Sequence, residues 1–145
     1  MFKHLLLPTD GSDASQRTVL EGVRLAKEFN AKITGISVVP EFHLLTFNTT
    51  MIEDTREVFT AESRSQANKY LTVLNKAADE AGVPCEIEVV LSDHPYEAII
   101  HAAKNKGCEL IIMASHGRRG MQSILIGSET QKVLTHSKIP VLVYR

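Results

Sequence analysis

Five short apolar runs recur along the chain, and each is separated from the next by a segment with helical periodicity. The runs cover residues 4–7, 33–39, 85–91, 110–114 and 141–144. Apart from Glu86 and Glu88 in the third run, they are largely apolar or β-branched, which is typical of parallel strands that are buried on both faces. This regular strand–helix alternation predicts an α/β fold, with an open parallel sheet of five strands and helices on both faces, joined by right-handed crossovers.

Glycines and capping patterns predict where the helices begin and end. Gly82 and Gly107 follow helical segments and predict their ends. Capping-box spacing, with Gln or Glu three residues after the cap, predicts helix starts at Asp13, Asp54 and Ser128. A start at Asp54 leaves a long apolar connection from Pro40. That connection either packs against the domain or a partner subunit, or forms a lid beside a ligand pocket.

Composition and charge exclude several classes of protein. A chain of 145 residues, 43% of them apolar, suits one domain over residues 1–145. Its net charge of −1 provides no strong field for nucleic acid or acidic lipid, and no apolar run approaches the roughly 20 residues of a membrane span. Cys85 and Cys108 have no C-x-x-C spacing, so we expect reduced thiols in a cytoplasmic protein without a signal peptide.

Polar residues follow the first strand-like run, where ligands of open parallel sheets bind. The run ends in "PTDGSD", which places a carboxylate, Asp10, at its carboxyl end. This carboxylate either accepts hydrogen bonds from ribose hydroxyls or buttresses the turn into the next helix, and the sequence leaves both roles open. Ser12 and Asp13 are predicted to be helix caps.

The fourth apolar run leads into an unusually long connection within residues 111–130. Such connections usually take about 2–6 residues, whereas this one takes about a dozen. Gly117 and Gly120 allow backbone N–H groups to approach an anion closely, and Gly127–Ser128 opens a helix whose free N–H groups face the same space. Arg118 and Arg119 add positive charge. The connection is therefore predicted to wrap the phosphates of a nucleotide.

Other ligand sites on this architecture are disfavoured by missing patterns. The chain has neither G-x-x-x-x-G-K-[ST] nor a G-x-G-x-x-G after a strand. A phospho-accepting receiver domain would need a lysine at the end of the fifth strand, where this chain has Tyr144 and Arg145. The six histidines lack the paired spacing of metal ligands.

The segments "HLLLPTDGSD", "IIMASHGRRGMQSILIGSETQKVL" and "IPVLVYR" closely resemble the universal stress protein family, in the same order along the whole chain. The ATP-binding branch of that family has the motif G-x-x-G, nine residues, then G-[ST]. Here Gly117, nine residues and Gly127–Ser128 match it, whereas Ala114 replaces the first glycine. The resemblance implies the adenine nucleotide alpha hydrolase-like fold, with strand order 3-2-1-4-5.

The resemblance also implies a site for ATP or AMP. Its implied ligand residues fall into four groups along the chain. Pro8, Thr9 and Asp10 would line adenine and ribose, Val38 would close over the adenine, Met113 and Ala114 would flank the sugar, and Gly117, Arg118, Gly127, Ser128, Glu129 and Thr130 would surround the phosphates. With ATP, a Mg²⁺ ion would find oxygen ligands only in Ser128, Thr130 and Asp10.

Two residues, Ala114 and Glu129, bear on the expected affinity for a nucleotide. If position 114 needs a positive φ, the Cβ of Ala114 costs roughly 1–2 kcal/mol, and otherwise it is harmless. The carboxylate of Glu129 would repel phosphates, which tilts the expected preference toward AMP or ADP over ATP unless Arg118 or Arg119 offsets it.

Three functional hypotheses follow. The first is a nucleotide-dependent regulator in the stress response, and the resemblance implies a homodimer in which Val141–Tyr144 pairs across a two-fold axis. The second is a weak ATPase or autophosphorylating enzyme at the same site, although no general base with an oriented partner can be identified. The third is an interaction protein that binds no nucleotide.

Overall fold

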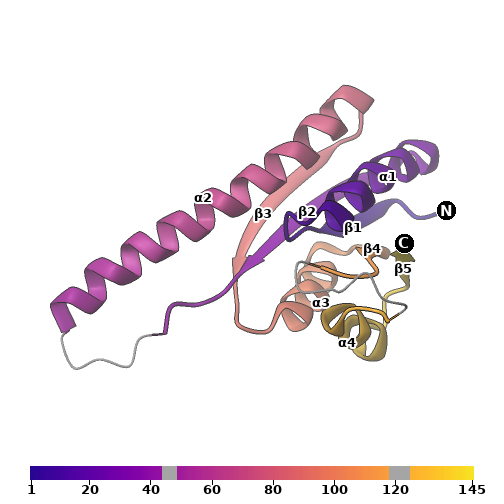
Figure 1. Cartoon of the computed structure of the whole chain (residues 1–145). Helices are drawn as coiled ribbons and strands as arrows, with labels where there is room; N and C mark the ends of the chain where they lie inside the picture. The colour runs from indigo at the N-terminus through magenta and orange to yellow at the C-terminus, as the bar shows by residue number, and fades with distance from the viewer. Residues whose placement is uncertain (44–48, 118–124) are drawn as a thin grey trace.

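The fold is an open parallel sheet with two helices on each face (Figure 1). The computed structural model describes residues 1–43, 49–117 and 125–145, with the side chains of residues 49–54 excepted. The elements are β1 (His4–Pro8), α1 (Asp13–Phe29), β2 (Lys32–Val39), α2 (Thr49–Ala81), β3 (Cys85–Leu91), α3 (Pro95–Lys106), β4 (Leu110–Ala114), α4 (Ser128–His136) and β5 (Val141–Tyr144). The strand order β3-β2-β1-β4-β5 confirms the predicted fold class.

The central strands β2, β1 and β4 contribute side chains to two separate cores, one on each face of the sheet, whereas the edge strands β3 and β5 are partly exposed. Leu5 and Leu7 of β1 point into a core covered by α1 and α2, whereas Leu6 points into a core covered by α3 and α4. All three side chains are fully buried. The five strands therefore lie where the apolar runs predicted them, with β1 and β2 one residue longer than expected.

The predicted helix ends are confirmed, and glycine explains them. Gly82, which follows α2, and Gly107, which caps α3, have φ of +71° and +68°, a left-handed conformation in which a Cβ is unfavourable. α1 ends in the same way at Asn30, with φ of 52°.

Of the three helix starts predicted from capping boxes, those at Asp13 and Ser128 are confirmed, whereas the one at Asp54 is wrong. Ser12 caps α1, because its side chain accepts a hydrogen bond from Ser15 N–H, and Asp13 is already helical. α2 begins at Thr49, so Asp54 lies inside the helix. α4 is capped by Gly127 without a side-chain hydrogen bond.

α2 extends well beyond the sheet (Figure 1). Its 33 residues span about 50 Å. Only its C-terminal half packs on the sheet, through buried side chains at Ala67, Leu71, Leu74 and Ala78. Because the helix starts early, the connection from β2 is shorter than predicted. Its Phe42 packs against Phe59 of α2, with ring centroids 5.4 Å apart, while residues 44–48 lie outside the described part of the chain.

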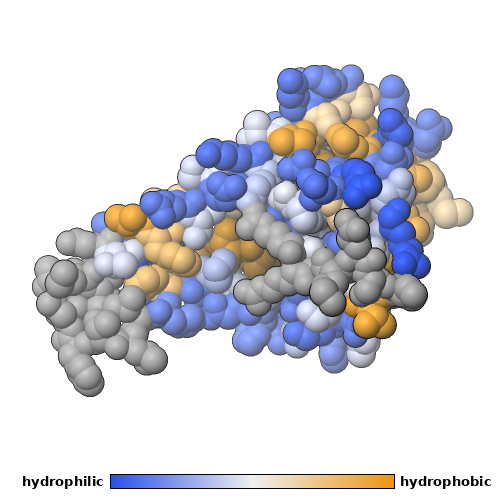
Figure 2. Space-filling model, viewed as in Figure 1, coloured by the Kyte–Doolittle hydropathy of each residue, from blue (hydrophilic) through white to orange (hydrophobic). Residues whose placement is uncertain are grey.

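The projecting half of α2 carries apolar surface. Figure 2 shows apolar side chains gathered toward that end of the molecule. Val58 is 58% exposed. Within the described ranges, no helix is both long enough and apolar enough to cross a bilayer.

Candidate functional site

A cavity of about 550 Å³ opens at the carboxyl ends of β1 to β4. It lies where the strand order reverses between β1 and β4, the usual ligand position in open parallel sheets. The predicted site residues that line it are Pro8, Thr9, Asp10, Val38, Met113, Ala114, Gly117, Gly127, Ser128, Glu129 and Thr130. Arg118 lies outside the described residues. The structure thus brings together all the predicted site residues that it describes.

The turn after β1 is fixed by hydrogen bonds. The N–H of Thr9 donates to the carbonyl of Ile36 in β2 (2.9 Å), and the hydroxyls of Thr9 and Ser15 lie 3.0 Å apart. Oδ1 of Asp10 accepts a hydrogen bond from Ser12 N–H (2.9 Å). Asp10 therefore buttresses the turn and also lines the cavity, so the two roles that the sequence left open are compatible.

Gly117 is needed for close approach rather than for an unusual φ. A Cβ on this residue would lie 2.4 Å from Oδ2 of Asp10. The glycines with positive φ in the described ranges are Gly11, Gly82 and Gly107, so no left-handed conformation is required at Gly117. Because Gly117 has no side chain, the backbone that follows β4 can lie directly against the Asp10 carboxylate.

The N-terminus of α4 faces the cavity with fewer donors than the sequence predicted. The N–H of Gly127 donates to the carbonyl of Ser115 (2.6 Å), and the hydroxyl of Thr130 donates to the carbonyl of Ala114 (2.9 Å). Neither of these two donors is available for a ligand in this arrangement, so the expected contacts of the Gly127 N–H and the Thr130 hydroxyl with phosphates are not supported, whereas the N–H of Thr130 is not affected. Their role is to lock the start of α4 against the end of β4.

The remaining donors at α4 are those of its first turn. The first intrahelical bond runs from the N–H of Gln131 to the carbonyl of Gly127 (3.0 Å). The N–H groups of Ser128, Glu129 and Thr130 therefore lack helical acceptors, as in every helix start. Together with the exposed hydroxyl of Ser128 and the positive end of the helix dipole, they form an anion-binding group at this end of the cavity.

Ala114 causes no strain. It is the last residue of β4 and pairs with Tyr144 of β5. Apart from glycines, Asn30 alone has a positive φ in the described part of the chain, so the Cβ of Ala114 costs nothing through backbone strain. Alanine at position 114 is therefore compatible with the backbone conformation at the end of β4.

The carboxylate of Glu129 is already compensated. Its Oε2 accepts a hydrogen bond from the N–H of Tyr96 in the first turn of α3 (2.9 Å), and its Oε1 pairs with Lys132 (3.0 Å). Glu129 thus caps α3 from another helix, and a cation lies beside it. The repulsion that the sequence predicted between Glu129 and phosphates is reduced accordingly.

The β3 end of the cavity was missed by sequence reasoning. Its walls there are formed by Pro40, Ser92, Asp93, Pro95 and Ile99, while Ser15 of α1 and His116, which follows β4, complete the lining elsewhere. The signal was present, because "SVVP" and "LSDHP" follow the second and third apolar runs. Those segments lack glycines, however, and the contacts between them join residues about fifty positions apart.

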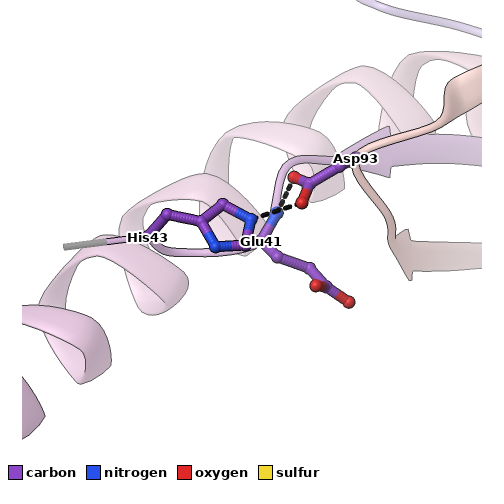
Figure 3. Close-up of side chains that lie close together, drawn as sticks. All are labelled: Glu41, His43 and Asp93. Carbon is purple, nitrogen blue, oxygen red and sulfur yellow. Dashed lines mark hydrogen bonds and ion pairs between the residues drawn. The ribbon is translucent and has the colours of Figure 1, made fainter. Parts of the chain in front are cut away.

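Asp93 is held by the segment that follows β2 (Figure 3). The N–H of Glu41 donates to Oδ1 of Asp93 (3.0 Å), and Nε2 of His43 contacts Oδ2. The hydrogen bond from His43, more than any other interaction, lowers the pKa of the Asp93 carboxyl below its usual value. Asp93 therefore remains ionised at neutral pH in a fixed orientation.

Glu41, His43 and Asp93 each have one atom that could bind a metal ion, and these atoms lie within 4.8 Å of one another. Histidine spacing in the sequence did not predict this grouping. All three are exposed, and Figure 3 shows the Glu41 carboxylate turned away from the other two groups.

Both cysteines are free and weakly acidic. Cys85 is half-buried and Cys108 is buried, and burial raises the pKa of each thiol to about 11. Since the thiolate is the reactive form, both are poor nucleophiles at neutral pH.

Comparison with known proteins identifies relatives along the whole chain. Residues 1–145 match the universal stress protein family. Universal stress protein YxiE of Bacillus subtilis is 34% identical, and the alignment covers 100% of both chains. The solved structure of hypothetical protein MJ0577 is 26% identical with a TM-score of 0.80, covering 99% of this chain and 95% of that one. A universal stress protein from Archaeoglobus fulgidus, solved in complex with dAMP, shares the fold at 15% identity, with a TM-score of 0.65 and coverage of 100% and 98%.

Proposed function

Because the chain belongs to the universal stress protein family, we propose that it binds an adenine nucleotide, ATP or AMP, and acts as a nucleotide-dependent regulator in the cytoplasm under stress. The observation that carries this proposal is the cavity at the strand ends, with the free amides of the α4 N-terminus at one side of it. The dAMP complex of the Archaeoglobus fulgidus protein supports the same class of ligand.

The dimensions of the cavity suit a mononucleotide. It reaches from β4 to β3, which are three strand spacings apart, or about 14 Å. Phosphates would lie at the N-terminus of α4, with the ribose near Asp10 and Ala114. The base would lie toward Val38, between the ends of β2 and β3. About 550 Å³ is within the usual range for small-molecule sites.

A Mg²⁺ ion accompanying ATP would find few protein ligands. Of the oxygen groups in the phosphate half of the cavity, the Asp10 carboxylate and the Ser128 hydroxyl line the wall, whereas the Thr130 hydroxyl is buried and donates to Ala114. Such an ion would take most of its ligands from phosphates and water, as Mg²⁺ usually does. It would neutralise phosphate charge without requiring a dedicated protein site.

Calorimetric titration of AMP, ADP and ATP tests the proposal. We expect binding of at least one of them. Because Lys132 compensates Glu129, AMP and ATP should have Kd values within about tenfold of each other. The absence of binding by all three would favour the family branch that lacks the glycine motif and works without nucleotide. Single-turnover assays with labelled ATP on the same sample would reveal slow hydrolysis or autophosphorylation.

We also propose a homodimer through β5. Ile111 and Ser115 N–H groups donate to the carbonyls of Pro140 and Tyr144, so Val141 and Val143 direct their backbone groups away from β4, toward the free edge. The edge is apolar, with Leu142 and Tyr144 exposed. The opposite edge, β3, is protected by charged Glu86, Glu88 and Lys106, which disfavours pairing there.

Substituting Val143→Pro tests this dimer. Proline removes the outward N–H of Val143 but leaves pairing with β4 intact, so the dimer should dissociate while the fold persists. Val143→Thr keeps the N–H and the β-branched shape, and serves as the matched control. Analytical ultracentrifugation should give a monomer for the proline variant and a dimer for the other two proteins. A proline variant that remains dimeric would place the interface elsewhere.

A further inference from the structure

The two ends of the cavity have opposite hydrogen-bonding character. The α4 end presents backbone N–H groups and a hydroxyl, whereas the β3 end presents Ser92 and Asp93 among the apolar side chains of Pro40, Pro95 and Ile99. Donors at one end suit phosphates, and an apolar end suits a base. Asp93 is the ionised group at that apolar end.

An ionised carboxylate only accepts hydrogen bonds. Asp93 offers about four lone-pair positions, of which the N–H of Glu41 and the ring of His43 occupy two (Figure 3). Both contacts come from the segment that follows β2, and each holds one of the two carboxylate oxygens of Asp93. The remaining positions are available to a donor on a ligand, and the orientation of the carboxylate is set before any ligand arrives.

Purine bases differ in what they present to such a group. Adenine carries an exocyclic amino group, which donates, whereas hypoxanthine carries a carbonyl oxygen at the same position, which only accepts. A carboxylate near that position stabilises the first base and repels the second. This chemistry distinguishes AMP from IMP although the two ligands have nearly the same shape and the same charge.

We propose that Asp93 is a specificity-determining residue that accepts a hydrogen bond from the exocyclic amino group of the bound base, so that the site selects amino-purine over oxo-purine nucleotides. The inference rests on the proposed function, since it requires that a nucleotide binds with its base at the β3 end. The role belongs to the side chain of Asp93, and Glu41 and His43 act only as positioning residues.

Titration of AMP and IMP into the wild-type protein and an Asp93→Asn variant tests the proposal. The wild type should bind AMP about three- to tenfold more tightly than IMP, the range for one hydrogen bond to a partly exposed charged group. In the variant the ratio should fall to about one or reverse, because an amide can also donate to the carbonyl of IMP. Circular dichroism of this surface variant should match the wild type.

Glu97→Gln is the matched control, because Glu97 lies in the first turn of α3 but does not line the cavity. It removes the same charge nearby, so any general electrostatic gain in nucleotide affinity appears in both variants while the AMP to IMP ratio changes only in Asp93→Asn. An unchanged ratio in Asp93→Asn, or equal binding of AMP and IMP by the wild type, would refute the role of Asp93 and leave the proposed function standing. Failure of the wild type to bind AMP, ADP, ATP and IMP alike would overturn both.

Discussion

A Gly117→Val variant should bind adenine nucleotides about tenfold to a hundredfold more weakly than the wild type while keeping its fold. The added Cβ would lie 2.4 Å from Oδ2 of Asp10, so either the carboxylate or the loop backbone must move. Both line the cavity, and the branched side chain would add bulk there. Overpacking of this kind costs about 1–3 kcal/mol, which corresponds to the expected loss of affinity. Calorimetric titration of AMP measures it.

A second glycine separates an effect on the site from an effect on stability. Gly107 has a φ of +68° and no atom within 4 Å of where its Cβ would lie, and it is far from the cavity lining. Gly107→Ala should therefore lower the free energy of unfolding by about 1 kcal/mol through backbone strain without changing nucleotide affinity. If Gly117→Val binds AMP as tightly as the wild type does, the nucleotide does not occupy this cavity.

The sequence predicted all five strands but misplaced one helix start, that of α2, for a physical reason. A buried parallel strand requires several consecutive apolar residues, so the runs that form the buried strands β1 and β4 leave little freedom in placement. A helix start depends on which of several neighbouring polar residues caps the backbone. The sequence offered both Ser12 and Asp13 for that role in α1, and Ser12 takes it, whereas α2 begins at Thr49, ahead of the predicted start at Asp54.

The candidate site was predicted where its residues share a local pattern, and missed where they do not. Asp10 and Gly117 each lie in a polar, glycine-containing segment that follows a strand, so their proximity follows from the parallel sheet. Asp93 has no such pattern around it, and its contacts with Glu41 and His43 depend on where β2 and β3 end side by side. Internal bonds of Gly127 and Thr130 could not be foreseen either, because they depend on how closely α4 approaches β4.

Leu74→Ala should lower the free energy of unfolding by about 2–5 kcal/mol, the usual cost of truncating a fully buried leucine. Leu74 is 0% exposed, and its Cδ2 lies only 2.1 Å from where a Cβ on Gly35 would be. The leucine thus rests directly on the backbone of β2, and Gly35 has no side chain that could relax into the space that truncation leaves. The cost should therefore lie in the upper part of that range.

Val73→Ala is the control for this substitution, since Val73 is the adjacent residue of α2 and is 42% exposed. It should change stability by about 0.5 kcal/mol or less. Urea unfolding measures both variants, and a similar loss in the two would show that α2 is not anchored through Leu74. Because Leu74 does not line the cavity, the folded Leu74→Ala protein should bind AMP as the wild type does. Leu74→Ala should thus lower stability without changing AMP affinity, whereas Gly117→Val should lower AMP affinity and keep the fold. The two results together would show that the packing that holds α2 on the sheet is independent of the close approach of Gly117 to Asp10 that shapes the cavity.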